Sequence, residues 1–211
     1  MLIAPSVLDA NYQSFQSEID SIATCDRIHL DVMDGQFVPN ISFGPPVFKQ
    51  IKFPVPIEAH LMVDNPQNFF DMFVELGCMG ITFHIENTGP DFALEYLQDL
   101  RSRGIKSGIC VDGDTDIEIL SPELLEASDQ ILLMSIKAGF GGQKFRPEIY
   151  DRIKWVRDQG YKGEIEIDGG VNLKNAPKLG EAGADIVVIG SALMKQPVED
   201  RAGIIEQVQL F

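Results

Sequence analysis

Basic residues are scarce in this chain of 211 residues, which carries 17 lysines and arginines against 32 aspartates and glutamates. The formal net charge of −15 argues against nucleic-acid binding, because that function requires a basic face. It argues equally against attachment to an anionic membrane surface. A small anionic substrate stays compatible with this charge, since backbone amide groups can create a local positive site within an acidic protein.

Cysteines and long apolar runs are also few. Cys25, Cys78 and Cys110 stand far apart and form no CxxC pair, which indicates reduced thiols in a cytoplasmic protein. The stretch MLIAPSVLDAN has no basic region and no long apolar segment, so we expect a first strand there and not a signal peptide. No run approaches the roughly 18 apolar residues that a membrane span needs.

Eight short apolar runs, each of strand length, recur along the chain. They span residues 2–8, 27–34, 56–63, 80–87, 106–112, 130–136, 163–171 and 185–193. Segments with helical spacing, or with Pro near the start and Gly at the end, lie between them at 11–23, 65–77, 90–104 and 147–160. Strands that alternate with helices predict a parallel sheet, because parallel neighbours need a crossover connection.

The number and even spacing of these strands decide between two parallel architectures. An open doubly wound sheet and a closed barrel both fit the alternation, but eight evenly spaced strands favour the barrel. No linker or composition change divides the chain. We therefore predict an α/β fold in which residues 1–211 form a single (β/α)8 TIM barrel.

Polar side chains occupy one phase of three of these runs, although both faces of a barrel strand are buried. The run 27–34 alternates Ile28, Leu30 and Val32 with His29, Asp31 and Met33. The other two polar phases consist of Glu58, His60 and Met62, and of Glu164, Glu166 and Asp168. Active sites of barrels lie at the carboxyl ends of the strands. If these phases face the interior, four residues meet at that mouth: His29, Asp31, His60 and Asp168.

Two imidazoles and two carboxylates form a donor set for a divalent transition metal. Each residue alone could be a buried polar group with ordinary hydrogen bonds, but four of them together favour a metal, which would offset their desolvation. The set suits Zn, Mn, Fe or Co. His84, the remaining histidine, could be a neighbour of the metal site, a substrate contact or a core histidine.

Three glycine-rich turns follow the last three runs: AGFGGQKF, DGG and GSA. Backbone amides of such turns can hold a phosphate, and barrels often bind phosphate after strands seven and eight. The alternative is three loops that need glycine only for its backbone freedom. Met33, Met62 and Met134 lie near strand ends, where they either fill the core or line a pocket that shields an anionic intermediate from water.

Taken together, these motifs resemble the ribulose-phosphate 3-epimerase family. The matching stretches follow the family's order over essentially the whole chain: APSVL, HLDVMDGQFVPNISFG, HLMV, GFGGQKF, IDGGV and GSALM. The second of these is long and specific. The resemblance implies a (β/α)8 barrel, a ketose-phosphate substrate and a homo-oligomer. It also implies one divalent metal ion per chain, held by His29, Asp31, His60 and Asp168.

The resemblance further implies the reaction, in which a 2,3-enediolate links D-ribulose 5-phosphate and D-xylulose 5-phosphate. The metal acts as a Lewis acid, while Asp31 and Asp168 remove and return the C3 proton on opposite faces. One aspartate must be ionised while the other is protonated, so the two titrate as a pair. The residues expected to contact the substrate are Ser6, Met33, His60, Met62, Met134, Gly139, Phe140, Gly141, Gly142, Asp168, Gly169, Gly170, Gly190 and Ser191.

Three loops depart from the family pattern. Lys137 and Ala138 stand in place of the usual Asn-Pro before GFGGQ, and Asp112 begins a turn that is usually Asn-Pro. LDANY, which contains Asp9 and Asn11, replaces LSADF of many members. These changes bear on the identity of the sugar more than on the reaction type.

Three other functions remain open at this point. The chain could be a 3-epimerase of another ketose phosphate such as D-allulose 6-phosphate, or a barrel that binds sugar phosphate without turnover. It could also be a lyase on a related phosphate-binding barrel, for which Lys137 is the nearby lysine. Lys137 itself has two possible roles. It could contact the phosphate or a terminal hydroxyl of the substrate, or it could be a solvated loop residue.

Overall fold

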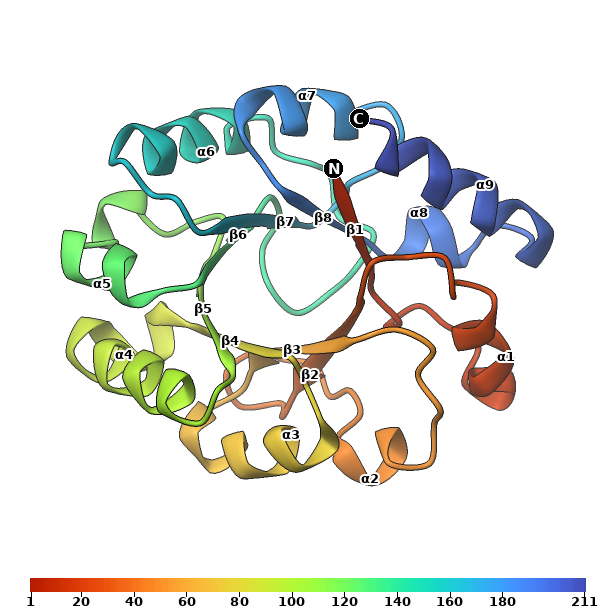
Figure 1. The fold of residues 1–211 in the computed structure, drawn as a ribbon, viewed down its shortest axis with the longest axis horizontal. Coiled ribbons are helices and arrows are strands. Elements are labelled where there is room, and N and C mark those ends of the chain that lie inside the picture. The colour runs from red at the N-terminus through yellow and green to blue at the C-terminus, as the bar shows by residue number, and fades with distance from the viewer.

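Eight parallel strands close into a barrel in the computed structural model, which describes residues 1–211 (Figure 1). The strands are β1 Leu2–Pro5, β2 Ile28–Met33, β3 Ile57–Met62, β4 Gly80–His84, β5 Lys106–Val111, β6 Gln130–Met134, β7 Glu164–Asp168 and β8 Ile186–Ile189. Hydrogen-bonded ladders run in the order β1-β8-β7-β6-β5-β4-β3-β2. A parallel bridge between Ser6 and His29 connects the two remaining edges. The predicted (β/α)8 barrel is therefore confirmed.

Helices form a ring around the strands (Figure 1). They are α1 Phe15–Asp20, α2 Pro45–Phe48, α3 Phe70–Leu76, α4 Ile85–Ser102, α5 Pro122–Ala127, α6 Ile149–Asp158, α7 Ala176–Ala182, α8 Ser191–Met194 and α9 Val198–Gln209. Short 3-10 helices lie at η1 Tyr12–Ser14, η2 Pro66–Asn68 and η3 Ile117–Ile119. Three of the four segments predicted to be helical contain a whole α-helix, namely α1, α3 and α6, and the fourth, 90–104, overlaps most of α4. None of the helices has the length and apolar character needed to cross a membrane.

The predicted runs are longer than the observed strands, and two of them continue into a helix. In the run 80–87, β4 ends at His84, and the last three residues form the beginning of α4. The run 185–193 passes from β8 into α8 at Ser191. Apolar residues continue across both boundaries, so hydrophobicity gives no sign of the change. In α4 the predicted start at Pro90 marks a real break, because Gly89 has a φ of 71° that interrupts the helix.

The two faces of each strand serve different cores. Ile28, Leu30 and Val32 belong to the largest hydrophobic cluster, which has 48 buried residues and packs the strands against the helices. The opposite phase of β2 faces the barrel interior. This orientation is shown by a contact between strands that are not neighbours in the sheet, in which His29 Nδ1 on β2 lies 3.6 Å from Glu166 Oε1 on β7.

A buried arginine closes the amino-terminal end of the interior. Arg27 is 4% exposed, and its Nη1 donates to Glu58 Oε2 at 3.0 Å, Gln130 Oε1 at 3.2 Å and Glu164 Oε2 at 3.1 Å. These partners come from β3, β6 and β7, so one side chain ties together strands from both sides of the barrel. Removing one partner of a buried ion pair costs about 3–5 kcal/mol, because the other charge stays buried and unpaired.

The interior is narrow beside β5, and a change at Gly108 tests how tightly it is filled. A Cβ added to Gly108 would lie 2.0 Å from Thr82 Oγ1 on β4. Gly108→Ala should therefore lower the free energy of unfolding by about 1–3 kcal/mol or more, the usual penalty for overpacking. Urea denaturation measures this change.

The control for this prediction is Gly203→Ala in α9, where an added Cβ meets nothing within 4 Å. Alanine is the better helix former, so this variant should gain roughly 0.5–1 kcal/mol. Equal stability of Gly108→Ala and the parent protein would contradict the packing described for the interior.

Candidate active site

Four polar side chains meet at the carboxyl-terminal mouth of the barrel: His29 and Asp31 from β2, His60 from β3 and Asp168 from β7. One candidate ligand atom of each lies within 4.8 Å of the others. The parallel register places Asp31 beside His60, and the cross-barrel contact of His60 brings in Asp168. The structure thus brings together all four residues that the strand phases suggested.

The imidazoles point ring nitrogens at the carboxylates. His60 Nδ1 lies 3.2 Å from Asp31 Oδ1, and His29 Nε2 lies 3.6 Å from the same oxygen. The histidines are almost completely buried, and the Asp168 side chain is 14% exposed. His29 Nε2 has no hydrogen-bond partner although it is buried.

Hydrogen bonds from outside the cluster orient two of these groups. Glu58 Oε1 lies 3.0 Å from His29 Nδ1, so a proton on Nδ1 is donated to Glu58 and the unpartnered Nε2 faces the cluster. Ser6 Oγ donates to Asp31 Oδ2 at 2.5 Å. Partners of this kind fix the ring orientation of histidines in metal sites.

These residues fit a divalent cation. A bare imidazole nitrogen buried beside carboxylates is unfavourable by itself, and a cation would satisfy it. Neutral imidazoles and carboxylates together match the ligands of Zn, Mn, Fe or Co. The cluster of His29, Asp31, His60 and Asp168 could therefore hold one metal ion.

The two aspartates have opposite electrostatic surroundings. Burial favours the neutral acid for both, but His29 and His60, whose ring nitrogens face Asp31, hold the pKa of Asp31 well below its usual range. Burial and the nearby charge of Asp31 raise the pKa of Asp168 to about 7. Burial lowers the pKa of His60 to about 4, against the opposing hydrogen bond to Asp31. Near neutral pH one carboxylate is therefore ionised while the other can carry a proton.

A cavity of about 260 Å³ opens directly above this cluster. Of the residues expected to contact the substrate, those that line it are Ser6, Met33, Met62, Met134, Gly139, Phe140, Gly141, Gly142, Asp168, Gly169, Gly170, Gly190 and Ser191. His60, which was also expected to contact the substrate, is 0% exposed and does not line the cavity. The three methionines are at most 4% exposed and form part of the cavity wall.

The glycine-rich turns converge on one side of this cavity. Gly169 has a φ of 111°, and a Cβ there would lie 2.5 Å from Ile136 Cγ1, so no other residue fits without a shift. Asn40 Nδ2 donates to Gly139 O at 2.7 Å and holds the turn after β6 from the opposite loop. Phe140 at the tip of that turn is 51% exposed.

Sequence reasoning missed several residues of the cavity wall, notably Asp9, Gln143 and Asn172. Asp9 Oδ2 lies 3.0 Å from the position of a Cβ on Gly141 and 3.8 Å from one on Gly190, so its carboxylate sits between two of the turns. Its Oδ1 pairs with Lys195 Nζ at 3.1 Å. The departure of LDANY from the family pattern was the available signal.

The other two departures lie outside the cavity. Lys137 is exposed and lines no part of it, which agrees with a solvated loop lysine and removes the basis for a lyase. Asp112 Oδ1 accepts hydrogen bonds from Gly113 N at 2.6 Å and from Ala138 N at 3.2 Å. Asp112 therefore joins two loops and does not border the sugar site.

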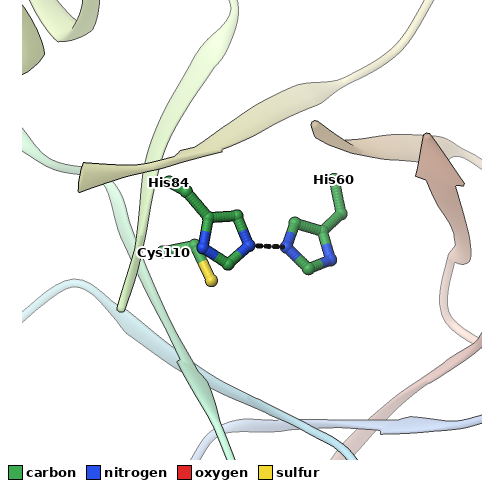
Figure 2. A group of neighbouring side chains, drawn as sticks. All are labelled: His60, His84 and Cys110. Carbon is green, nitrogen blue, oxygen red and sulfur yellow. Dashed lines mark hydrogen bonds between the residues drawn. The ribbon is translucent and has the colours of Figure 1, made fainter. Parts of the chain in front are cut away.

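His84 lies behind His60 and not in the cavity. Its Nε2 is 2.9 Å from His60 Nε2, and its side chain is 1% exposed (Figure 2). Of the three roles considered for this histidine, the geometry agrees with a neighbour of the candidate metal site. Cys110 approaches the same pair (Figure 2), and all three cysteines of the chain are free and buried.

Solved structures with the same fold include enzymes of different activities. A 3-hexulose-6-phosphate synthase superposes with a TM-score of 0.74 at 15% identity, covering 100% of this chain and 99% of that one. A tryptophan synthase structure from Pyrococcus furiosus gives a TM-score of 0.71 at 19% identity, covering 100% and 98%. At these identities the likeness concerns the barrel alone.

Sequence relatives are more specific. A ribulose-phosphate 3-epimerase from Mycobacterium leprae is 40% identical over 200 residues, covering 91% of this chain and 87% of the relative. The same-named protein from Helicobacter pylori strain J99 is 38% identical over 215 residues, covering 99% and 97%. The family model described as the ribulose-phosphate 3 epimerase family matches residues 2–194. This chain therefore belongs to the ribulose-phosphate 3-epimerase family.

Proposed function

We propose that this chain is a metal-dependent isomerase that interconverts D-ribulose 5-phosphate and D-xylulose 5-phosphate. The observation that carries the proposal is the pair Asp31 and Asp168, which reach one mouth from β2 and β7 and both line its cavity. Epimerisation at C3 needs one base and one acid on opposite faces of a planar intermediate. Two carboxylates that border one cavity from β2 and β7 meet that need.

Asp31 and Asp168 have distinct starting roles in this proposal. The ionised Asp31 takes the C3 proton of one epimer, and the protonated Asp168 delivers a proton to the other face. In the reverse direction the two exchange roles, since each ends the turnover in the state from which the other began. A divalent cation held by the cluster would supply a Lewis acid that makes the C3 proton more acidic and stabilises the enediolate.

The rest of the cavity supports a phosphorylated ketose. Backbone of the turns at Gly141, Gly170 and Gly190 approaches the cavity closely and can donate to a phosphate. Met33, Met62 and Met134 present apolar thioethers around the acid–base pair and would keep water from the anionic intermediate. The metal's identity, the homo-oligomeric state and the cytoplasmic location stay predictions.

Metal removal tests the first half of the proposal. Protein treated with a strong chelator should lose epimerisation of D-ribulose 5-phosphate, because the enediolate then lacks its electrophile. Adding back Zn, Mn, Fe or Co, one at a time, should restore turnover at one ion per chain. Coupled assays for D-xylulose 5-phosphate together with metal analysis give both quantities. Full activity in protein shown to be metal-free would rule out the metal-dependent mechanism.

Substitution of the aspartates tests the acid–base pair. Asp31→Asn and Asp168→Asn should each lower kcat by about 10²–10⁴-fold, because asparagine cannot exchange a proton. Metal content measured in each variant separates loss of the acid–base group from loss of the ion. Near-normal turnover in either variant would remove that aspartate from the mechanism.

Asp9 offers a test of the phosphate position. Its carboxylate lies between the Gly141 and Gly190 turns, so it should repel a phosphate held there. Asp9→Asn should lower KM several-fold and leave kcat unchanged, the pattern for an effect on ground state and transition state alike. Added salt should shrink the difference by screening the charge.

The matched control for Asp9 is Asp158→Asn, which also breaks a pair with a lysine but lies at the far end of α6, away from the mouth. Lys137→Ala, outside the cavity, should likewise leave kcat/KM unchanged. If Asp9→Asn leaves KM at the parent value in low salt, the phosphate is not bound between these turns.

A further inference from the structure

His84 and Glu86 extend the candidate metal centre outward from His60. Figure 2 shows the rings of His60 and His84 pointing at one another, and their Nε2 atoms are 2.9 Å apart. On the far side of His84, its Nδ1 lies 3.1 Å from Glu86 Oε2. The other Glu86 oxygen accepts a hydrogen bond from Asp112 N at 2.7 Å. A continuous line of hydrogen bonds thus runs from the end of β5 to His60.

Neither histidine touches the substrate cavity. His60 is 0% exposed and His84 is 1% exposed, and neither contributes to the cavity wall. Whatever this line of contacts does for the reaction, it acts through His60 and not on the sugar.

The contact with Glu86, at the outer end of this line, fixes which atom donates in each hydrogen bond. An ionised carboxylate can only accept, so His84 Nδ1 donates to Glu86. A neutral imidazole carries one N–H, which leaves His84 Nε2 as an acceptor. The proton between the two rings then belongs to His60 Nε2. His60 Nδ1, 3.2 Å from Asp31 Oδ1, then keeps its lone pair for a cation, which would take the place of the hydrogen bond that this nitrogen can otherwise donate to Asp31.

We propose that His84 and Glu86 are positioning residues that hold His60 as its Nε2–H tautomer, with Nδ1 free to ligate the metal. This inference rests on the proposed metal-dependent function. Glu58 acts in the same way on His29, whose Nδ1 it engages and whose Nε2 it leaves free. His29 therefore presents Nε2 to the cluster and His60 presents Nδ1. A carboxylate orients His29 directly, whereas a second imidazole orients His60.

A competing use of the same side chains is a separate metal site formed by His60, His84 and Cys110, whose candidate ligand atoms lie within 4.8 Å of one another. A cation there would need free lone pairs on both Nε2 atoms. The 2.9 Å contact between those atoms is instead a hydrogen bond, which requires a proton on one of them. Substitution of Cys110 separates the two arrangements.

The experiment measures metal affinity without substrate. Metal-depleted full-length protein is titrated with Zn²⁺ in competition with a chromophoric chelator. His84→Phe keeps a ring but removes the acceptor for His60, and Glu86→Gln leaves an amide N–H₂ facing either His84 or Asp112 N. Both should weaken Zn²⁺ binding about 10–100-fold, the usual effect of losing such an outer partner. His84→Gln, whose amide oxygen can accept from His60, should recover part of the loss, and Cys110→Ala should bind as the parent does.

A second readout follows the tautomer itself. ¹⁵N NMR of the Zn²⁺-loaded parent should show His60 protonated at Nε2, and that signal should shift in Glu86→Gln. Thermal unfolding of each metal-depleted variant checks its fold; if His84→Phe does not fold, Glu86→Gln carries the test alone.

Three different results would contradict the positioning role, favour the separate metal site or refute the proposed function. Parent-like affinity in Glu86→Gln, together with an Nδ1-protonated His60, would overturn the positioning role. A loss in Cys110→Ala as large as in His84→Phe would overturn it in favour of the separate site. Failure of the parent chain to bind any divalent ion would instead refute the proposed function on which the inference rests.

Discussion

Two carboxylates buried at one mouth of a barrel are the constraint on which the rest of this site depends. Asp31 and Asp168 cannot both ionise freely at short range in a poorly solvated place, because like charges there repel strongly. His29 and Ser6 stabilise the charge on Asp31, and Asp168 is left with a pKa of about 7. Repulsion between these two carboxylates would be destabilising in an ordinary core. Here it moves the pKa values of Asp31 and Asp168 apart, as an epimerisation with one base and one acid requires.

Supporting these groups takes polar contacts through the depth of the barrel. Arg27 at the base holds Glu58, and Glu58 in turn orients His29. Barrel interiors are ordinarily filled by branched apolar side chains, so this arrangement places polar groups where apolar side chains usually lie. The compensation lies outside them, where 48 buried apolar residues join the outer strand faces to the helices. Stability and chemistry are thereby assigned to opposite faces of the same strands.

Much of this could be predicted from the sequence, because a period of two is unambiguous in runs such as 27–34. The phase of His29 and Asp31, the number of strands and the glycine-rich turns together placed the cluster at the correct end of the barrel. The role of Glu86 could not be predicted, since its run reads as strand while β4 ends at His84. The position of Asp9 could not be predicted either, because it depends on how separate loops fold against one another.

The loop departures at positions 112 and 138 are best understood as one change. Where the family pattern has proline, Ala138 has a backbone N–H, and Ala138 is only 6% exposed. A buried N–H without a partner is destabilising, and Asp112 Oδ1 supplies the acceptor at 3.2 Å. The backbone N–H of Asp112 meanwhile donates to Glu86 at 2.7 Å. One residue at the end of β5 therefore joins the loop that contains GFGG to the line of contacts behind His60, so an altered loop sequence leaves the geometry at the metal cluster supported.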